Sequence, residues 1–238
     1  SRGWEAVGRL DLGDRGFCTG ALIAPDLVLT AAHCLFDKTT GQPVPPAEIR
    51  FLAGLRNGRA AAYRGVRRAV VHPSYAFEGE DRLERVASDL ALIELDQAIR
   101  LPSLRPYAVG AGPARGEEVG VVSYARDRAE AASLQEVCQV LGRQPGVLVL
   151  SCSVDFGSSG APIFVIRNGV AEVVSVVSAK AEVTGEPVAL GTALEAPLAE
   201  LRAVLAASSV HMRRVDRSGS TDGTRTGGAA RDARFLRP

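Results

Sequence analysis

Short apolar runs separated by turn-forming residues recur along this chain and limit its fold more than any other feature. One pair predicts a hairpin, because runs at 20–24 and 27–30 flank the turn dipeptide Pro25-Asp26. Repeated short strands without intervening helical patterns predict an all-β sandwich or barrel, and not a sheet of strand–helix–strand units. The further runs lie at 49–52, 69–71, 90–95, 120–123, 147–150, 163–166 and 173–178.

One helix is predicted near the carboxyl end. Leu194, Leu198, Leu201 and Leu205 recur at steps of four, three and four, which places them on one helical face. We expect this helix to dock on the β-structure. Arg, Asp, Gly, Ser and Thr dominate residues 213–238 without periodicity, so we expect a flexible tail that buries too little apolar surface to offset its ordering entropy.

Length and composition fit a soluble globular protein. A chain of 238 residues, 46% hydrophobic and 23% charged, suffices for one large β-domain or two small lobes that share a cleft. The net charge of +1 favours neither nucleic acid nor a membrane surface as the main partner. Residues 1–4 do not combine a basic stretch with an apolar one, so the chain is expected to be either a form whose signal peptide has been removed or a cytosolic protein.

The four cysteines bear on the cellular compartment. They allow three pairings, and the local ones, Cys18–Cys34 and Cys138–Cys152, are favoured because each pair brackets two strand-like runs. A metal site at Cys18, His33 and Cys34 lacks a fourth ligand and a CxxC spacing, so we expect neither metal nor cofactor. Two disulfides favour an oxidising compartment, and hence a secreted or periplasmic protein.

Three local signals with catalytic chemistry follow one another along the chain. His33 comes after a strand, Asp89 opens an apolar strand, and Ser159 lies in a glycine-flanked loop. A serine nucleophile needs a base, a carboxylate that orients this base, and amide donors for the oxyanion. Each signal alone also fits an ordinary structural role, but their joint occurrence predicts His33, Asp89 and Ser159 as a triad. The backbone amides of Gly157 and Ser159 are the predicted oxyanion hole.

These residues carry a resemblance to the chymotrypsin/trypsin-like serine endopeptidases, in which the triad has the same chain order. The resemblance covers roughly residues 4 to 207 and implies two six-stranded antiparallel β-barrels with the active site between them, followed by a C-terminal helix. It implies a protease domain at 1–212, with the boundary between lobes near 100–115. The segments that carry it are the histidine motif at 30–34, a stretch at 71–75, the aspartate motif at 88–92, the serine motif at 157–162 and a substrate-binding strand at 176–178.

One departure concerns activation. Animal members of the family begin at a freed Ile-Val-Gly-Gly terminus, whose amino group pairs with an aspartate before the catalytic serine. Ser158 occupies that position here and no such start is present, so we do not expect this switch. The chain is more similar to the bacterial branch, which includes the glutamyl endopeptidases. The Cys138–Cys152 pair also suits bacterial relatives.

The resemblance further implies a primary specificity pocket. Trypsin-type enzymes carry an aspartate at the position of Ser153, and glutamyl endopeptidases a histidine at that of Val177. The hypothesis is therefore a small or medium uncharged residue before the cleaved bond. If the loop alignment shifts by two residues, Asp155 would occupy the aspartate position and favour Lys or Arg before the bond. Lys180 could contact an acidic side chain of the substrate or only narrow the pocket entrance. The implied substrate-binding residues are Ser153, Val154, Val177, Ser178, Lys180 and Gly191.

The resulting interpretation is a serine endopeptidase that acts through an acyl-enzyme on protein or peptide substrates. We expect a monomer, with neither nucleic acid nor membrane insertion involved. The alternative is a catalytically silent relative that uses the fold as a binding or scaffold module. An α/β-hydrolase is excluded because Ala161 breaks the GxSxG elbow and only His211 follows the serine.

Overall fold

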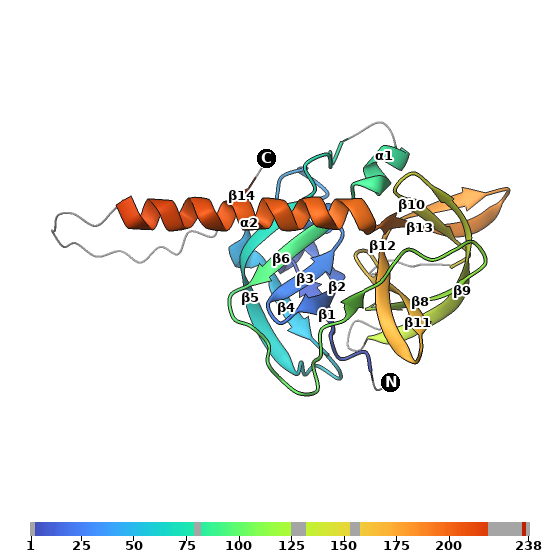
Figure 1. Cartoon of the computed structure of the whole chain (residues 1–238), viewed down its shortest axis with the longest axis horizontal. Coiled ribbons are helices and arrows are strands. Elements are labelled where there is room, and N and C mark those ends of the chain that lie inside the picture. The colour runs from blue at the N-terminus through green and yellow to red at the C-terminus, as the bar shows by residue number, and fades with distance from the viewer. Residues whose placement is uncertain (1–2, 79–81, 125–131, 153–157, 219–234, 237–238) are drawn as a thin grey trace.

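The computed structural model describes residues 3–78, 82–124, 132–152, 158–218 and 235–236. Two β-barrels lie side by side, and a long C-terminal helix, α2 (Glu195–Ser218), runs along the first of them (Figure 1). The predicted all-β class with a terminal helix is confirmed. Within the described residues, no helix is both long and apolar enough to cross a membrane.

The first barrel is closed by six strands in the order β5-β4-β1-β2-β3-β6, with β5 also pairing with β6. The predicted hairpin is present, because Leu22 of one strand faces Val28 of the next across the Pro25-Asp26 turn. The elements are β1 (Val7–Asp11), η1 (Gly13–Arg15), β2 (Phe17–Ala24), β3 (Leu27–Thr30), η2 (Ala32–Leu35), η3 (Pro46–Glu48), β4 (Arg50–Ala53), β5 (Ala62–Val71), α1 (Arg82–Ala87) and β6 (Ala91–Leu95).

The second barrel has the order β11-β8-β9-β10-β13-β12, and β11 pairs with β12 to close it. A bulge interrupts β12, since Val177 pairs with Gly191 whereas Ala179 pairs with Leu190, and Ser178 lies between them. The elements are β7 (Ala108–Val109), β8 (Glu118–Ser123), β9 (Ser133–Gln144), β10 (Val147–Leu150), β11 (Pro162–Arg167), β12 (Val170–Val183) and β13 (Glu186–Ala193).

A shared apolar core joins the two barrels. Phe164 of β11 belongs to the same buried cluster as the interior of the first barrel, and its ring centroid lies 4.9 Å from that of Trp4. The fully buried Tyr124 follows β8, and its amide donates a hydrogen bond to Thr19 Oγ1 of β2 (3.0 Å). The lobes therefore meet through packed side chains as well as through the connecting chain.

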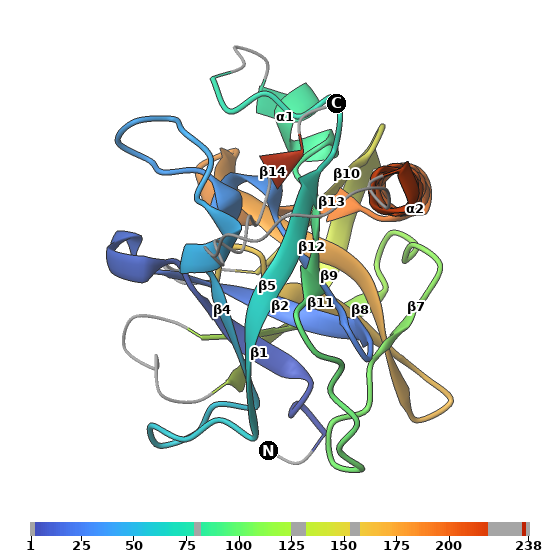
Figure 2. The ribbon, with the colours of Figure 1, turned by 90° about the vertical axis from the view of Figure 1, so that its left-hand side faces the viewer.

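The C-terminal helix docks as predicted, with Leu198 and Leu201 buried. Its backbone continues past residue 212, where we expected a tail without regular structure, and reaches Ser218. Helix propagation adds one hydrogen bond for each residue fixed, so a helix that is already docked extends at less cost than a new helix begins. The apolar pair β14 (Phe235–Leu236) also departs from that expectation, because it adds a short parallel strand to the edge of β5 (Figure 2).

Both predicted disulfides are present. Cys18 of β2 is bonded to Cys34 of η2, and Cys138 of β9 is bonded to Cys152, which follows β10. Each bond therefore ties neighbouring segments within one barrel.

Candidate active site

His33 and Asp89 meet because two antiparallel strands end side by side. Thr30 at the end of β3 pairs with Ala91 at the start of β6, so the residues just beyond this pair become neighbours. His33 Nδ1 lies 2.7 Å from Asp89 Oδ2, and the His33 backbone amide donates to Asp89 Oδ1 over 2.8 Å. The strand register thus fixes both the backbone and the ring of His33 against one carboxylate.

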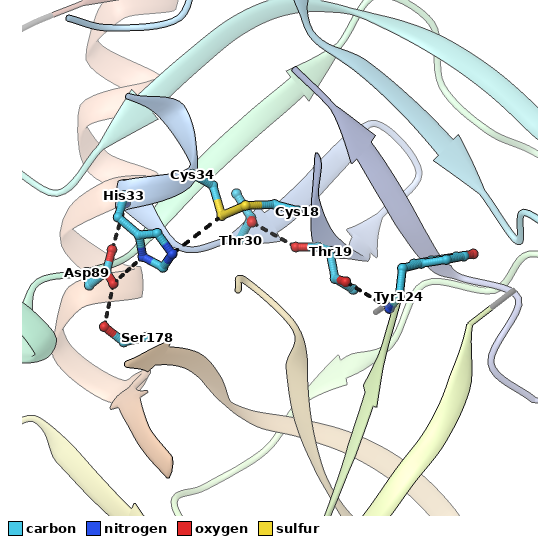
Figure 3. The surroundings of a disulfide bond; sticks show 8 residues. All are labelled: Cys18, Thr19, Thr30, His33, Cys34, Asp89, Tyr124 and Ser178. Atoms are coloured by element: carbon cyan, nitrogen blue, oxygen red, sulfur yellow. Dashed lines mark hydrogen bonds and ion pairs between the residues drawn. A yellow bond between two sulfur atoms is a disulfide. The ribbon is translucent and has the colours of Figure 1, made fainter. Parts of the chain in front are cut away.

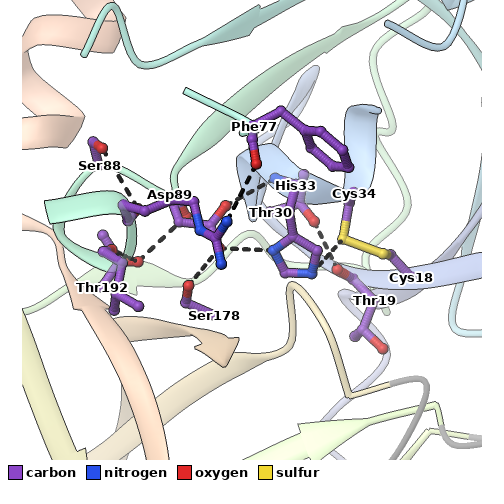
Figure 4. A network of polar contacts seen from close by, with 12 residues as sticks. Cys18, Thr19, Thr30, His33, Cys34, Phe77, Ser88, Asp89, Ser178 and Thr192 are labelled. Carbon is purple, nitrogen blue, oxygen red and sulfur yellow. Dashed lines mark hydrogen bonds and ion pairs between the residues drawn. A yellow bond between two sulfur atoms is a disulfide. The ribbon is translucent and has the colours of Figure 1, made fainter. Parts of the chain in front are cut away.

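The Asp89 carboxylate is almost fully buried, with 3% of the residue exposed. A third donor reaches it from the second barrel, since the Ser178 hydroxyl donates to Oδ2. Thr192 Oγ1 donates to the Asp89 backbone carbonyl over 3.3 Å, and Figure 4 shows these contacts together. A buried carboxylate is tolerated when hydrogen-bond donors replace its lost hydration, and three groups do so here.

The other ring nitrogen of His33 points away from Asp89. Nε2 lies 3.9 Å from Cys34 Sγ, and Figure 3 shows the ring between the carboxylate and the disulfide. In the tautomer whose Nδ1 carries the proton toward Asp89, Nε2 is the ring nitrogen that offers a lone pair. The three side chains of Cys18, His33 and Cys34 are close enough to resemble a metal site, but both sulfurs are bonded to each other and offer no thiolate.

Ser159 lies in a turn that packs against the strands leading to His33. Its carbonyl oxygen accepts a hydrogen bond of 2.9 Å from the amide of Thr19 in the first barrel. The following Gly160 has φ +74°, and a Cβ there would lie 2.2 Å from Thr30 Oγ1 and 2.5 Å from the Thr19 carbonyl oxygen. Only glycine fits this close approach between the two barrels.

Ser158 is buried against a second serine of the second barrel, Ser123. It is 1% exposed, and its Oγ lies 3.2 Å from Oγ of the buried Ser123 at the end of β8. Sequence reasoning identified Ser158 as a substitute for the family's aspartate but gave no signal for Ser123. That residue is recognisable only once the fold brings β8 behind the serine turn.

The residues implied for the primary pocket are placed only in part. Val177 is buried and pairs with Gly191, where a Cβ would lie 2.4 Å from Ser175 Oγ. Lys180 is exposed further along β12. Ser178 lies beside them, and its bond to Asp89 is a contact that the sequence did not reveal. Ser153, Val154, Asp155 and Gly157 lie outside the described residues.

A cavity of 370 Å³ opens beside His33 on the side of Asp89. Burial raises the pKa of Tyr75 in its wall, the Asp89 charge adds to this effect, and Arg85 opposes it. The lining residues are His33, Lys38, Tyr75, Phe77, Arg85, Val86, Asp89, Ser178, Ala179 and Leu190.

Comparisons with known proteins agree with this architecture. Residues 18–174 match the family described as "Trypsin-like peptidase domain". A curated relative, the "Modular serine protease" of Drosophila melanogaster, is 37% identical over 99 residues, which are 39% of this chain. The match covers 15% of that relative's length.

Two solved structures have a similar fold. A Glu endopeptidase in complex with MPD superposes with a TM-score of 0.70 at 16% identity, over 86% of this chain and 92% of the other. A thermostable serine protease, AL20, from an extremophilic microorganism gives a TM-score of 0.64 at 17% identity, over 81% and 93% of the two chains. At these identities the likeness shows the shared two-barrel fold.

Proposed function

We propose that this chain, which belongs to the trypsin-like peptidase family, is a serine-type endopeptidase that cleaves peptide bonds through an acyl-enzyme formed on Ser159. The observation that carries this proposal is the pairing of His33 with the buried Asp89, 2.7 Å apart, beside the turn that bears the serine. The base and the group that orients it are then fixed before substrate binds, which favours catalysis.

In the proposed reaction, Ser159 Oγ attacks the substrate carbonyl while His33 Nε2 accepts the hydroxyl proton. Asp89 holds the ring in the required tautomer and stabilises the imidazolium that forms. His33 then donates the proton to the leaving amine, and a water molecule hydrolyses the ester by the reverse sequence. We assign the oxyanion hole to the backbone amides of Gly157 and Ser159, because a glycine before the serine turn allows both to face one point.

The proposed substrate residue before the cleaved bond is small or medium and uncharged. Ser153 offers no charge for a lysine or arginine, and Val177 offers no imidazole for a glutamate. Cleavage of a peptide library that is dominated by Lys or Arg before the bond would overturn this part of the proposal.

The proposed setting is secreted or periplasmic, with the protein acting as a monomer on protein or peptide substrates and without nucleic acid. Two disulfides support an oxidising compartment. A net charge of +1 supports the absence of a polyanionic partner.

Labelling with a fluorophosphonate probe tests the proposed nucleophile. We expect the wild type and Ser103→Ala, a variant at an exposed serine, to be labelled equally, and Ser159→Ala not to be labelled. His33→Ala should lower turnover by roughly several orders of magnitude, as loss of a triad base does elsewhere. A wild type that the probe does not label at Ser159 would favour the catalytically silent binding module instead.

A further inference from the structure

The cavity beside His33 holds two cationic side chains to which the proposed reaction gives no role. Arg85 belongs to α1, is half-buried, and donates through Nη1 to the Phe77 carbonyl oxygen over 3.3 Å. Lys38 lies on the exposed segment after η2. Within the part of the chain that the structure describes, neither side chain forms an ion pair with a carboxylate.

The one carboxylate in the cavity wall does not balance these two charges. Asp89 is 3% exposed and already accepts from the His33 amide, the His33 ring and the Ser178 hydroxyl. The accessible part of the wall is therefore positive. Charges in a recess with apolar walls attract an opposite charge more strongly than the same groups on an open surface.

The apolar part of the wall would suit the body of a side chain that enters the cavity. Tyr75 and Phe77 are half-buried, and their rings each pack against Phe36, with centroids 5.7 and 5.4 Å away. Val86 and Leu190 complete this surface. A carboxylate on a short methylene chain matches such a lining, because its methylenes contact apolar groups while its charge meets Arg85 and Lys38.

The position of the cavity identifies the substrate residue concerned. The residue before the cleaved bond enters the pocket at Val177 and Gly191 in the proposed function. Successive side chains of an extended peptide point to opposite faces. The preceding residue therefore points away from that pocket, toward the bulge at Ser178 and the cavity that Ser178 and His33 line.

We infer that this cavity selects an acidic side chain two residues before the cleaved bond, with Arg85 and Lys38 as its specificity-determining residues. This inference rests on the proposed endopeptidase function and adds a second recognition element to it. It differs from a preference for glutamate directly before the bond, which would require a cation in the primary pocket.

Paired fluorogenic peptides test the preference. Each pair has Glu or Gln two residues before the bond and the same residue, chosen from the peptide library, directly before it. We expect the wild type to have a kcat/KM for the Glu peptide roughly fivefold to tenfold higher, the range of one or two partly screened ion pairs. The double variant Lys38→Gln/Arg85→Gln should lose this ratio, and Arg85→Glu should favour a Lys peptide.

Matched controls separate the local effect from net charge and folding. Arg50→Gln removes one exposed positive charge that lies outside the cavity, and it should keep the preference for Glu. Arg85→Lys should retain most of the preference because the charge remains. Equal rates for the Glu and Gln peptides in the wild type would overturn the inference, as would a preference that persists in the double variant.

A binding measurement distinguishes failure of this inference from failure of the proposed function. Calorimetric titration of Ser159→Ala with the same Glu and Gln peptides detects recognition without requiring chemistry. We expect tighter binding of the Glu peptide, again roughly fivefold to tenfold, and equal binding when Lys38 and Arg85 are also replaced. Equal binding in Ser159→Ala itself rejects the acidic site whether or not the wild type is labelled by the fluorophosphonate.

Discussion

The hydroxyl oxygens of Ser123 and Ser158 lie 3.2 Å apart in the interior of the second barrel, directly behind the turn that carries Ser159. Both residues are buried, at 0% and 1% exposure. In animal relatives an aspartate at this position pairs with a freed terminal amino group, according to the resemblance in sequence. Two neutral hydroxyls need no charged partner. The contact between Ser123 and Ser158 therefore supports the serine turn without an ion pair.

Replacing Ser158 by alanine tests this support. The Ser123 hydroxyl would lose a partner inside the barrel, and we expect the free energy of unfolding to fall by about 1 kcal/mol. We also expect slower fluorophosphonate labelling of Ser159, because the turn is less firmly held. Chemical denaturation and labelling kinetics give the two quantities, with Ser103→Ala as the exposed control. An unchanged labelling rate would show that Ser158 supports only the fold.

The Asp89 carboxylate is the target of the second prediction. In Asp89→Asn an amide NH₂ replaces one oxygen that accepts from His33 or Ser178, so a donor faces a donor and the ring loses its fixed orientation. We expect kcat to fall by roughly three to four orders of magnitude. The exposed Asp26→Asn provides the matched control. A loss of less than about tenfold would remove Asp89 from the catalytic machinery proposed above.

The two disulfides allow a matched comparison. They join residues separated by 16 and 14 positions, so the chain-entropy model predicts a similar loss of about 3 kcal/mol when either pair is replaced by alanine. Only the Cys18–Cys34 bond adjoins His33. The two double variants should therefore have similar melting temperatures, whereas kcat should fall only for Cys18→Ala/Cys34→Ala. A comparable fall in kcat for Cys138→Ala/Cys152→Ala would contradict this assignment.

Three tyrosines, of which Tyr107 and Tyr124 are buried and Tyr75 is half-buried, predict a loss of stability in alkali. Burial is the main cause that raises the pKa of Tyr75, Tyr107 and Tyr124 above the ordinary value of about 10. Between the ordinary pKa and the raised one, the unfolded chain has lost the phenol proton and the folded chain keeps it, so stability falls as pH rises. Below about pH 10 both states keep this proton and these groups cause no slope.

The melting temperature measured from pH 8 to 12 should thus decline most steeply above about pH 10. Tyr124→Phe should reduce that slope because it removes one of the titrating groups. The slope, and not the absolute melting temperature, is the relevant quantity, since this variant also loses the hydrogen bond from Tyr124 Oη to the Leu55 carbonyl oxygen (3.2 Å). Tyr63→Phe, at 45% exposure, is the control. Equal slopes for wild type and Tyr124→Phe would contradict the prediction.

Local pattern predicted much of this fold. The Pro25-Asp26 hairpin and the β10, β11 and β12 strands follow from apolar runs and turn residues that lie close together in the chain. β1 and β9 were missed because charged or polar residues interrupt their apolar positions, as Arg9 does in β1. The short helix α1 was also missed, since its six residues are too few for a clear helical period.

The candidate site also contains residues that local motifs predict and contacts that they do not. Motifs led to His33 and Asp89, which lie in contact, and to Ser159, whose catalytic role stays a prediction. The contacts of Ser178 with Asp89 and of Ser123 with Ser158 carry no local signal, because each joins residues distant in the chain. The positive charge of the cavity beside His33 could not be predicted from the sequence either. It arises where α1 and the segment after η2 approach β12.

The hydrogen bond from the Thr19 amide to the Ser159 carbonyl links one barrel to the other at the proposed nucleophile. A refolding experiment tests whether each barrel regains its own strands before this link forms. If it does, far-ultraviolet circular dichroism recovers ahead of hydrolysis, and the delay between the two signals times the docking of one half of the molecule onto the other.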